Sequence, residues 1–256
     1  MTGERAAQSG GRANAGPSVA VFRPDDDRLA TAVDFLAAAG ADPLPDPMLA
    51  VHPTGRLPRT DAAYTILTSK TGAELLAGTD WTPGGDLVAI GPSTADALQA
   101  AGFSVDHVPE TYTSAGLVEA LADRVAGERV EVARSDHGSA VLLDGLEAAG
   151  AYCHETVLYE LTRPDGAGES TAAVAAGEVD GLLFTSSLTV EHFAEAARER
   201  GNWDAVQSTL PDVVVGAIGP PTKETAEDAG IAVDVVPDEA DFEALADAVL
   251  DHLATE

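Results

Sequence analysis

Small, hydroxyl-bearing and cationic residues recur in this chain where buried apolar runs end. They are Arg23, Thr68, Ser69, Gly91, Ser93, Thr94, Arg134, Ser186, Ser187, Gly219 and Thr222. A strand that ends in a Gly-Pro turn or in hydroxyl residues presents backbone N–H groups and a helix N-terminus to whatever lies beyond it. Such groups bind ligands through hydrogen bonds, so these residue types predict a binding site at the ends of the strands.

The Gly-Pro motif occurs twice, and this repetition organises the rest of the chain. The segment 88–98, VAIGPSTADAL, returns as 215–225, VGAIGPPTKET. Further residues match at a spacing of 128: Gly102 with Gly230, Val105 with Val233, Pro109 with Pro237, and Leu117 with Leu245. Two such motifs in one chain predict two similar lobes with a ligand held between them.

The elements that position these residues alternate between strand and helix. Apolar runs typical of buried strands occupy 18–22, 64–67, 130–133 and 181–184, and a third strand of each copy is expected at 105–108 and 233–236. Helical patterns follow the strands, and the last of each copy covers 117–125 and 242–253. This order predicts an α/β fold of two doubly wound parallel-sheet lobes, with ligands at the carboxyl ends of the strands.

Composition places the chain among globular proteins of a reducing compartment. Its 256 residues are 45% apolar, which is enough for packed cores. A single cysteine, Cys153, excludes an internal disulfide and favours the cytosol. We expect no membrane span and no signal peptide, and the Gly- and Ala-rich residues 1–16 are expected to form a disordered tail.

The charge is strongly acidic. Asp and Glu number 43 against 14 Lys and Arg, which gives a formal net charge of −29. Nucleic acid is therefore excluded as a partner, because its phosphates require a basic surface. Only Lys70 and Lys223 are lysines. An acidic, lysine-poor chain of this kind is typical of a protein that stays soluble in strong salt, where charge repulsion is screened.

Several motifs together resemble the uroporphyrinogen-III synthase family. They are the Thr-Ser turn after a buried strand, the Ile-Gly-Pro-x-Thr turn, the Val-Pro-Glu-x-Tyr-x-Ser-x-x-Leu segment at 108–117, the helix start after Arg134 and the Val-Leu-Tyr-Glu segment at 157–160. No one of these is diagnostic, but their order and spacing match over about residues 18–253.

The resemblance implies a discontinuous domain arrangement. One lobe would comprise 17–47 plus 163–256, and the other 52–158. The segments 48–51 and 159–162 would lie side by side as a two-stranded hinge.

The resemblance also implies a reaction. Hydroxymethylbilane, a linear tetrapyrrole with eight carboxylates, would lose water and close to uroporphyrinogen III with inversion of its last ring, without a cofactor or metal. Tyr159 would assist the departure of water. Arg23, Arg134 and Lys223 would be the few cations near the site. The enzyme would be a cytoplasmic monomer, receiving its substrate from hydroxymethylbilane synthase.

Simpler interpretations exist for each of these residues. The Gly-Pro turns could be ordinary loops, and Ser69, Thr94, Ser186 and Thr222 could act only as helix caps. Arg23 and Arg134 could pair with the nearby acidic residues 25–27 and 136. Tyr159 could simply pack one hinge segment on the other. The alternative functions are a non-catalytic two-lobed binder of an anionic molecule and a sensing module that acts through a partner.

Overall fold

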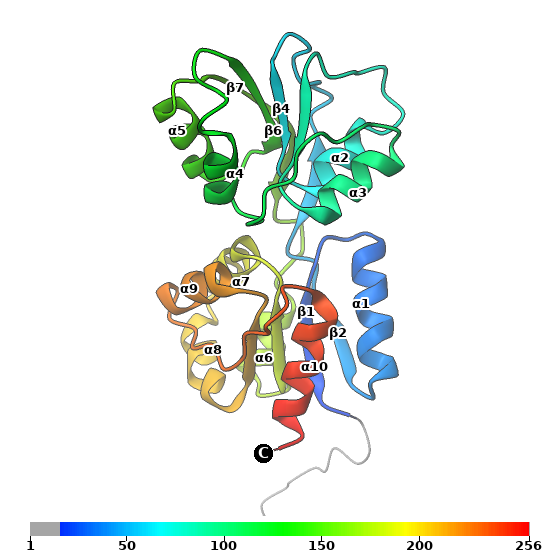
Figure 1. The fold of residues 1–256 in the computed structure, drawn as a ribbon. Coiled ribbons are helices and arrows are strands. Elements are labelled where there is room, and N and C mark those ends of the chain that lie inside the picture. The colour runs from blue at the N-terminus through cyan, green and yellow to red at the C-terminus, as the bar shows by residue number, and fades with distance from the viewer. Residues whose placement is uncertain (1–15, 256) are drawn as a thin grey trace, which may run out of the picture. The chain divides into compact units, whose positions relative to one another are not determined.

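The computed structural model describes residues 16–255, so the predicted tail lies outside the described residues except for Gly16. The chain divides into two compact units. Unit 1 comprises Met1–Ala50 and Arg163–Glu256, and unit 2 comprises Val51–Thr162. Each unit is built on its own sheet (Figure 1).

Unit 1 holds a four-stranded parallel sheet in the order β2-β1-β8-β9. The strands are β1 (Ser18–Phe22), β2 (Asp42–Pro45), β8 (Gly181–Phe184) and β9 (Val214–Ala217). Val19 to Phe22 are fully buried, because parallel strands are covered on both faces. The uniformly apolar run in the sequence follows from this double burial.

Helices cover both faces of the unit 1 sheet (Figure 1). One face packs against α1 (Asp27–Ala38) and α10 (Phe242–Leu253). The other packs against α6 (Ser170–Ala175), α7 (Ser187–Glu199), α8 (Trp203–Thr209) and α9 (Pro220–Asp228), with the 3-10 turn η1 (Leu210–Asp212) after α8. The stacked rings of Phe22 and Phe184, 4.9 Å apart, lie in this second core.

Unit 2 holds a five-stranded sheet in the order β3-β7-β6-β4-β5. The strands are β3 (Ala50–Pro53), β4 (Tyr64–Leu67), β5 (Asp86–Ala89), β6 (Arg129–Ser135) and β7 (Tyr152–Thr162). On one face lie α2 (Lys70–Leu76) and α3 (Pro92–Ala100), and on the other lie α4 (Ser114–Leu121) and α5 (Ala140–Ala148). The neighbouring strands β3 and β7 contain residues 50–51 and 159–162 of the two segments expected to form a hinge.

The two sheets share one plan, as the repeat predicted. In unit 1 the strand order β2-β1-β8-β9 corresponds to β7-β6-β4-β5 in unit 2. The expected α/β class and parallel pairing are confirmed. Among the described residues, no helix is both long and apolar enough to span a bilayer.

The expected third strands at 105–108 and 233–236 are wrong. Each segment makes only an isolated bridge, Val88 with His107 and Gly216 with Val235. The reason is a side chain that takes the place of a strand carbonyl. Asp106 accepts a hydrogen bond from Leu87 N at 2.8 Å, and Asp234 accepts one from Val215 N at 2.8 Å. A carboxylate in the ladder leaves the backbone pairing incomplete.

Candidate functional site

Two of the predicted site residues, Tyr159 and Ser69 of unit 2, are joined by a side-chain hydrogen bond. Tyr159 lies on β7 and Ser69 follows the carboxyl end of β4, beyond β6 in the sheet order. The Tyr159 hydroxyl donates to Ser69 Oγ at 2.9 Å. Tyr159 is 5% exposed and packs in the core between the sheet and the α2–α3 pair, whereas Ser69 is only partly buried.

Ser69 also begins α2. Its backbone is extended and its Oγ accepts from Gly72 N at 3.0 Å, which is the N-cap interaction that the sequence predicted. A Cβ on Gly72 would stand 3.2 Å from Ser69 Oγ and 3.3 Å from Leu158 Cδ1. A glycine at 72 therefore lets the capping serine and the core of β7 approach the helix closely.

The Gly-Pro turn of unit 2 forms a second helix start, that of α3. Gly91 is the N-cap and makes no side-chain cap bond, and Pro92 opens the helix. The N–H groups of Ser93 and Thr94 have no intrahelical acceptor, since they belong to the first turn. Tyr112 packs against Gly91, because a Cβ there would lie 3.3 Å from the tyrosine ring.

The interpretation of Thr94 and Thr222 as helix caps is wrong. In both Gly-Pro turns the N-cap is glycine, Gly91 or Gly219, and proline occupies the first turn. Proline has its φ fixed near the helical value, so it starts the helix two residues before the threonine. Thr94 and Thr222 are 2% and 4% exposed and lie on the buried side of their helices.

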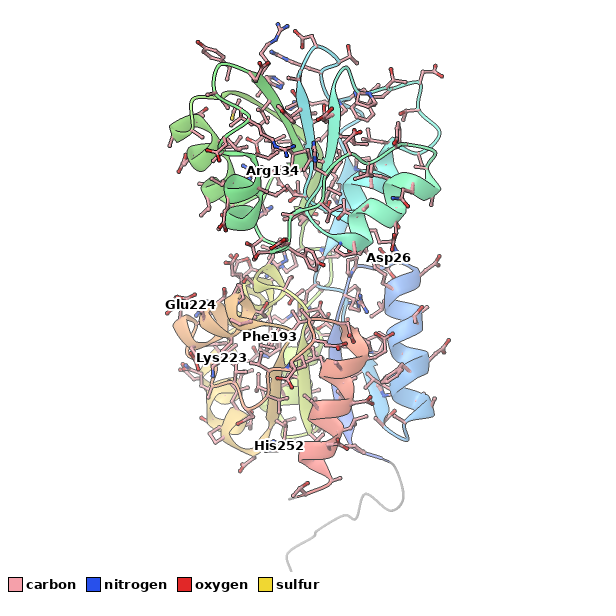
Figure 2. The ribbon with its side chains drawn as sticks, viewed as in Figure 1. Asp26, Arg134, Phe193, Lys223, Glu224 and His252 are labelled. Atoms are coloured by element: carbon pink, nitrogen blue, oxygen red, sulfur yellow. The ribbon has the colours of Figure 1, made fainter. Side chains whose placement is uncertain are left out.

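Arg134 is placed away from solvent. Its side chain is 5% exposed, and its Nε donates to Glu155 Oε1 at 2.5 Å while Nη1 donates to Ser139 O at 2.5 Å. The pairing with Asp136 considered from the sequence is not the one formed, since Asp136 instead contacts His137 and Leu161 N. Arg134 thus fastens the loop that leads into α5 (Figure 2).

Unit 1 carries the corresponding hydroxyl residues after β8. Ser186 caps α7 in a reciprocal capping box with Thr189. Ser187 Oγ donates to Pro221 O at 3.2 Å and accepts from Thr225 Oγ1 at 2.8 Å. Ser187 therefore ties the start of α7 to the start of α9.

The two Gly-Pro turns differ in the number of N–H groups that they offer. The first turn of α9 contains Pro220 and Pro221, neither of which has an N–H. Only Thr222 retains a first-turn N–H without an intrahelical acceptor, whereas α3 retains two. The turn in unit 2 is therefore the stronger hydrogen-bond donor.

The two other cations among the predicted site residues, Arg23 and Lys223, belong to unit 1 and are partly buried. The Arg23 guanidinium stands 4.9 Å above the Phe242 ring. Burial lowers the pKa of Arg23, as does the charge of Arg28, although Glu243 and Asp26 oppose this. Lys223, on α9 beside Glu224 (Figure 2), pairs with Glu227 at 3.6 Å and is 42% exposed.

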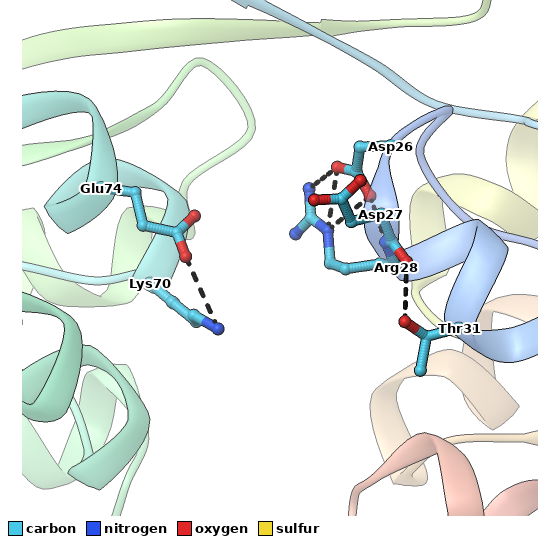
Figure 3. A network of polar contacts seen from close by, with 6 residues as sticks. All are labelled: Asp26, Asp27, Arg28, Thr31, Lys70 and Glu74. Atoms are coloured by element: carbon cyan, nitrogen blue, oxygen red, sulfur yellow. Dashed lines mark hydrogen bonds and ion pairs between the residues drawn. The ribbon is translucent and has the colours of Figure 1, made fainter.

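Two further charged residues, outside the predicted site, lie at helix starts. Asp26 caps α1 and holds Arg28 through its Nε at 3.0 Å, and the Thr31 hydroxyl donates to Asp27 O within the same helix (Figure 3). In unit 2, Lys70 opens α2 and pairs with Glu74 at 3.5 Å (Figure 3). The signal for Lys70 was its rarity and its position directly after Ser69.

The family model described as uroporphyrinogen-III synthase HemD matches residues 27–247. A uroporphyrinogen-III synthase of Chlorobaculum parvum is 29% identical over 170 residues, which is 64% of this chain and 65% of the relative. A relative from Methanothermobacter thermautotrophicus, provisionally named as the same enzyme, is 36% identical over 146 residues, 56% of this chain and 57% of the relative.

These matches span between about half and two thirds of each relative's length. A solved structure shares the fold over more of the chain. A mutant uroporphyrinogen III synthase from Thermus thermophilus aligns with a TM-score of 0.64 at 19% identity, covering 93% of this chain and 100% of that one. With a family model that matches most of its length, the chain belongs to the uroporphyrinogen-III synthase family.

Proposed function

We propose that this protein cyclises hydroxymethylbilane to uroporphyrinogen III, with loss of water and inversion of the last pyrrole ring. The observation that carries the proposal is the Tyr159–Ser69 hydroxyl pair at the carboxyl end of the unit 2 sheet, in a chain that belongs to this family. An enzyme of this kind is a lyase that works in the cytoplasm. It acts as a monomer and receives its substrate from hydroxymethylbilane synthase.

The protein has little bond-making or bond-breaking to catalyse, and its main task is to control the conformation of the substrate. The substrate loses water and closes by itself to the isomer with an unturned ring. The protein therefore has to hold the chain in the conformation that leads to inversion, and such positioning is a large source of rate enhancement. One hydroxyl donor for the departing water supplies the rest, typically about 10²- to 10⁴-fold.

The groups that bind the substrate's carboxylates are mostly uncharged. In unit 2 they are the first-turn N–H groups of Ser93 and Thr94 in α3, with Gly91 at the N-cap of that helix and Thr68 beside Ser69. In unit 1 they are Ser186, Ser187, Gly219, Thr222, Arg23 and Lys223. Each helix start contributes about 0.3–1 kcal/mol at an exposed position, so several must act together. Arg134 holds the loop before α5 in place through its hydrogen bonds to Glu155 and Ser139.

The isomer ratio tests this proposal. Hydroxymethylbilane is generated in situ by its synthase in high salt, the products are oxidised, and the type III and type I porphyrins are separated and measured. We expect type III to dominate when the protein is present and type I to dominate with heat-denatured protein. Type I alone in both reactions would remove the enzyme and leave the non-catalytic binder and the sensing module, whose ligand binding would then be tested by titration with the substrate.

A further inference from the structure

The Tyr159–Ser69 pair contains two hydroxyl protons but only one shared hydrogen bond. Ser69 Oγ accepts from Tyr159 Oη at 2.9 Å and from Gly72 N at 3.0 Å. A serine oxygen has two lone pairs, and these two donors occupy both. With Tyr159 as the donor, the proton of Ser69 points in a third direction, and within residues 16–255 we find no hydrogen bond that Ser69 Oγ donates.

The two hydroxyls differ in access to a ligand. Tyr159 is 5% exposed and its ring belongs to the core formed with Leu67, Leu76 and Leu158. Ser69 is partly exposed and stands at the end of β4, on the outer side of the pair. A substrate hydroxyl that approaches this end of the sheet meets Ser69 before it meets the phenol.

We propose that Ser69 hands its proton to the departing hydroxyl of the substrate and that Tyr159 replaces this proton through their hydrogen bond. Ser69 is then the catalytic residue that contacts the reacting atoms, and Tyr159 is the residue that reprotonates Ser69. This inference rests on the proposed function and concerns the O–H of Ser69, not the helix that it caps.

The step balances without any other reactant. The C–O bond of the hydroxymethyl group breaks, its electron pair leaves with the oxygen, and the Ser69 proton converts that oxygen to water. The Tyr159 proton moves to Ser69, and the negative charge of the resulting phenolate balances the positive charge left on the pyrrole system. After ring closure, the attacked carbon loses its proton to restore aromaticity. That proton returns through Ser69 to Tyr159, so the sum is loss of one water.

The inference is tested with substitutions that separate capping from proton transfer. Ser69→Asn retains an N-cap of equal quality and an acceptor for Tyr159, but has no transferable proton. Ser69→Thr retains both properties. In single-turnover assays we expect the type III rate to fall about 10²-fold in Ser69→Asn and to stay within a few-fold of wild type in Ser69→Thr.

A double mutant shows whether the two hydroxyls act as one unit. We expect Tyr159→Phe to slow the reaction as much as Ser69→Asn, and the combination to add no further loss, because groups in one relay are not additive. The control is Thr113→Asn, at the N-cap of α4, where Thr113 accepts from Gly116 N at the same 3.0 Å. This variant leaves the rate unchanged.

Outcomes that contradict the relay are distinct from failure of the proposed function. Wild-type rate in Ser69→Asn, or losses that multiply in the double mutant, would overturn the relay while type III formation by wild type stands. If Ser69→Asn does not fold, the wild-type rate in mixtures of H₂O and D₂O decides. Two protons in flight give a curved dependence on deuterium fraction, and a straight line would overturn the inference.

Discussion

At the scale of single residues, the buried hydroxyl of Tyr159 is the group on β7 for which we predict a role in the reaction. The same strand, β7, carries Tyr152, which is 70% exposed. We expect Tyr159→Phe to lower the rate of type III formation about 10²-fold, because the change deletes the partner of Ser69 but keeps the packed ring. The isomer ratio moves toward type I, as measured by separation of the oxidised products.

The matched change Tyr152→Phe removes a hydroxyl of the same kind from the same strand. We expect it to leave both rate and ratio unchanged. Loss of one hydrogen bond in Tyr159→Phe costs about 1 kcal/mol of folding free energy, too little to unfold the protein. Equal activity of the two variants would remove Tyr159 from the reaction.

The carboxylate of Asp136 links the acid stability of the protein to a specific loop. Burial alone would raise the pKa of Asp136, but hydrogen bonds from His137 and Leu161 N outweigh it and hold the pKa below the ordinary 3.8. A carboxylate with a depressed pKa stabilises the folded state above its unfolded pKa, and this contribution disappears as the pH falls through the folded pKa.

We therefore expect Asp136→Asn to lower the unfolding free energy near neutral pH and to have little effect well below the ordinary pKa of 3.8. Urea denaturation of both proteins across this range measures the difference. A difference that persists unchanged in strong acid would contradict the assignment of the stabilising interaction to the ionised carboxylate.

At the scale of elements, each sheet ends at an aspartate that replaces a backbone acceptor. Removal of Asp106 leaves the N–H of the fully buried Leu87 without its partner. We expect Asp106→Ala to lower the unfolding free energy by about 1–2 kcal/mol, and Asp234→Ala in unit 1 to do the same. Asp106→Asn keeps an acceptor and loses less. Exposed Asp96 on α3 supplies the control, Asp96→Ala, which stays near wild type.

The sequence predicted those elements in which local chemistry and tertiary structure agree. The buried strand 18–22 and the caps Ser69 and Ser186 came directly from apolar runs and hydroxyl positions. It failed for the segment at 105–108, because an aspartate side chain can imitate a strand carbonyl and no periodic pattern shows this.

The hydrogen-bond partners of Arg134 could not be predicted from the sequence either. Its partners Glu155 and Ser139 lie 21 and 5 positions away, and only the parallel register of β6 and β7 brings Glu155 within reach. Likewise, the hydrogen bond between Ser69 and Tyr159 joins residues 90 positions apart, so no local sequence pattern predicts it. Pairings that depend on strand order require the fold to be known first.

At the scale of the whole molecule, charge is the dominant feature. A net charge of −29 destabilises a compact state through self-repulsion. Raising salt from about 0.1 M to 1 M shortens the screening distance from roughly 10 Å to 3 Å. We therefore expect the melting temperature to rise by several degrees over this range in potassium chloride, as followed by circular dichroism.

Sulfate provides the comparison, because it also strengthens burial of apolar surface by exclusion from the protein. Screening alone predicts that chloride and sulfate act alike once matched for ionic strength, and any excess in sulfate measures exclusion. A melting temperature that stays flat in chloride would show that repulsion is not the limiting term.

The discontinuity of unit 1 has a consequence for synthesis. Phe22, at the end of β1, is bonded through its carbonyl to Thr185, which follows 163 positions later. As the chain leaves the ribosome, all of unit 2 emerges before β8, the strand that pairs with β1 on one side. Although α1 and β2 follow at once, Val19 to Phe22 therefore lack their β8 neighbour and the later helices of both faces until the last third of the chain has been synthesised. Nascent-chain folding is thus ordered from the middle of the protein outward, and the early segment is the part that most needs a chaperone.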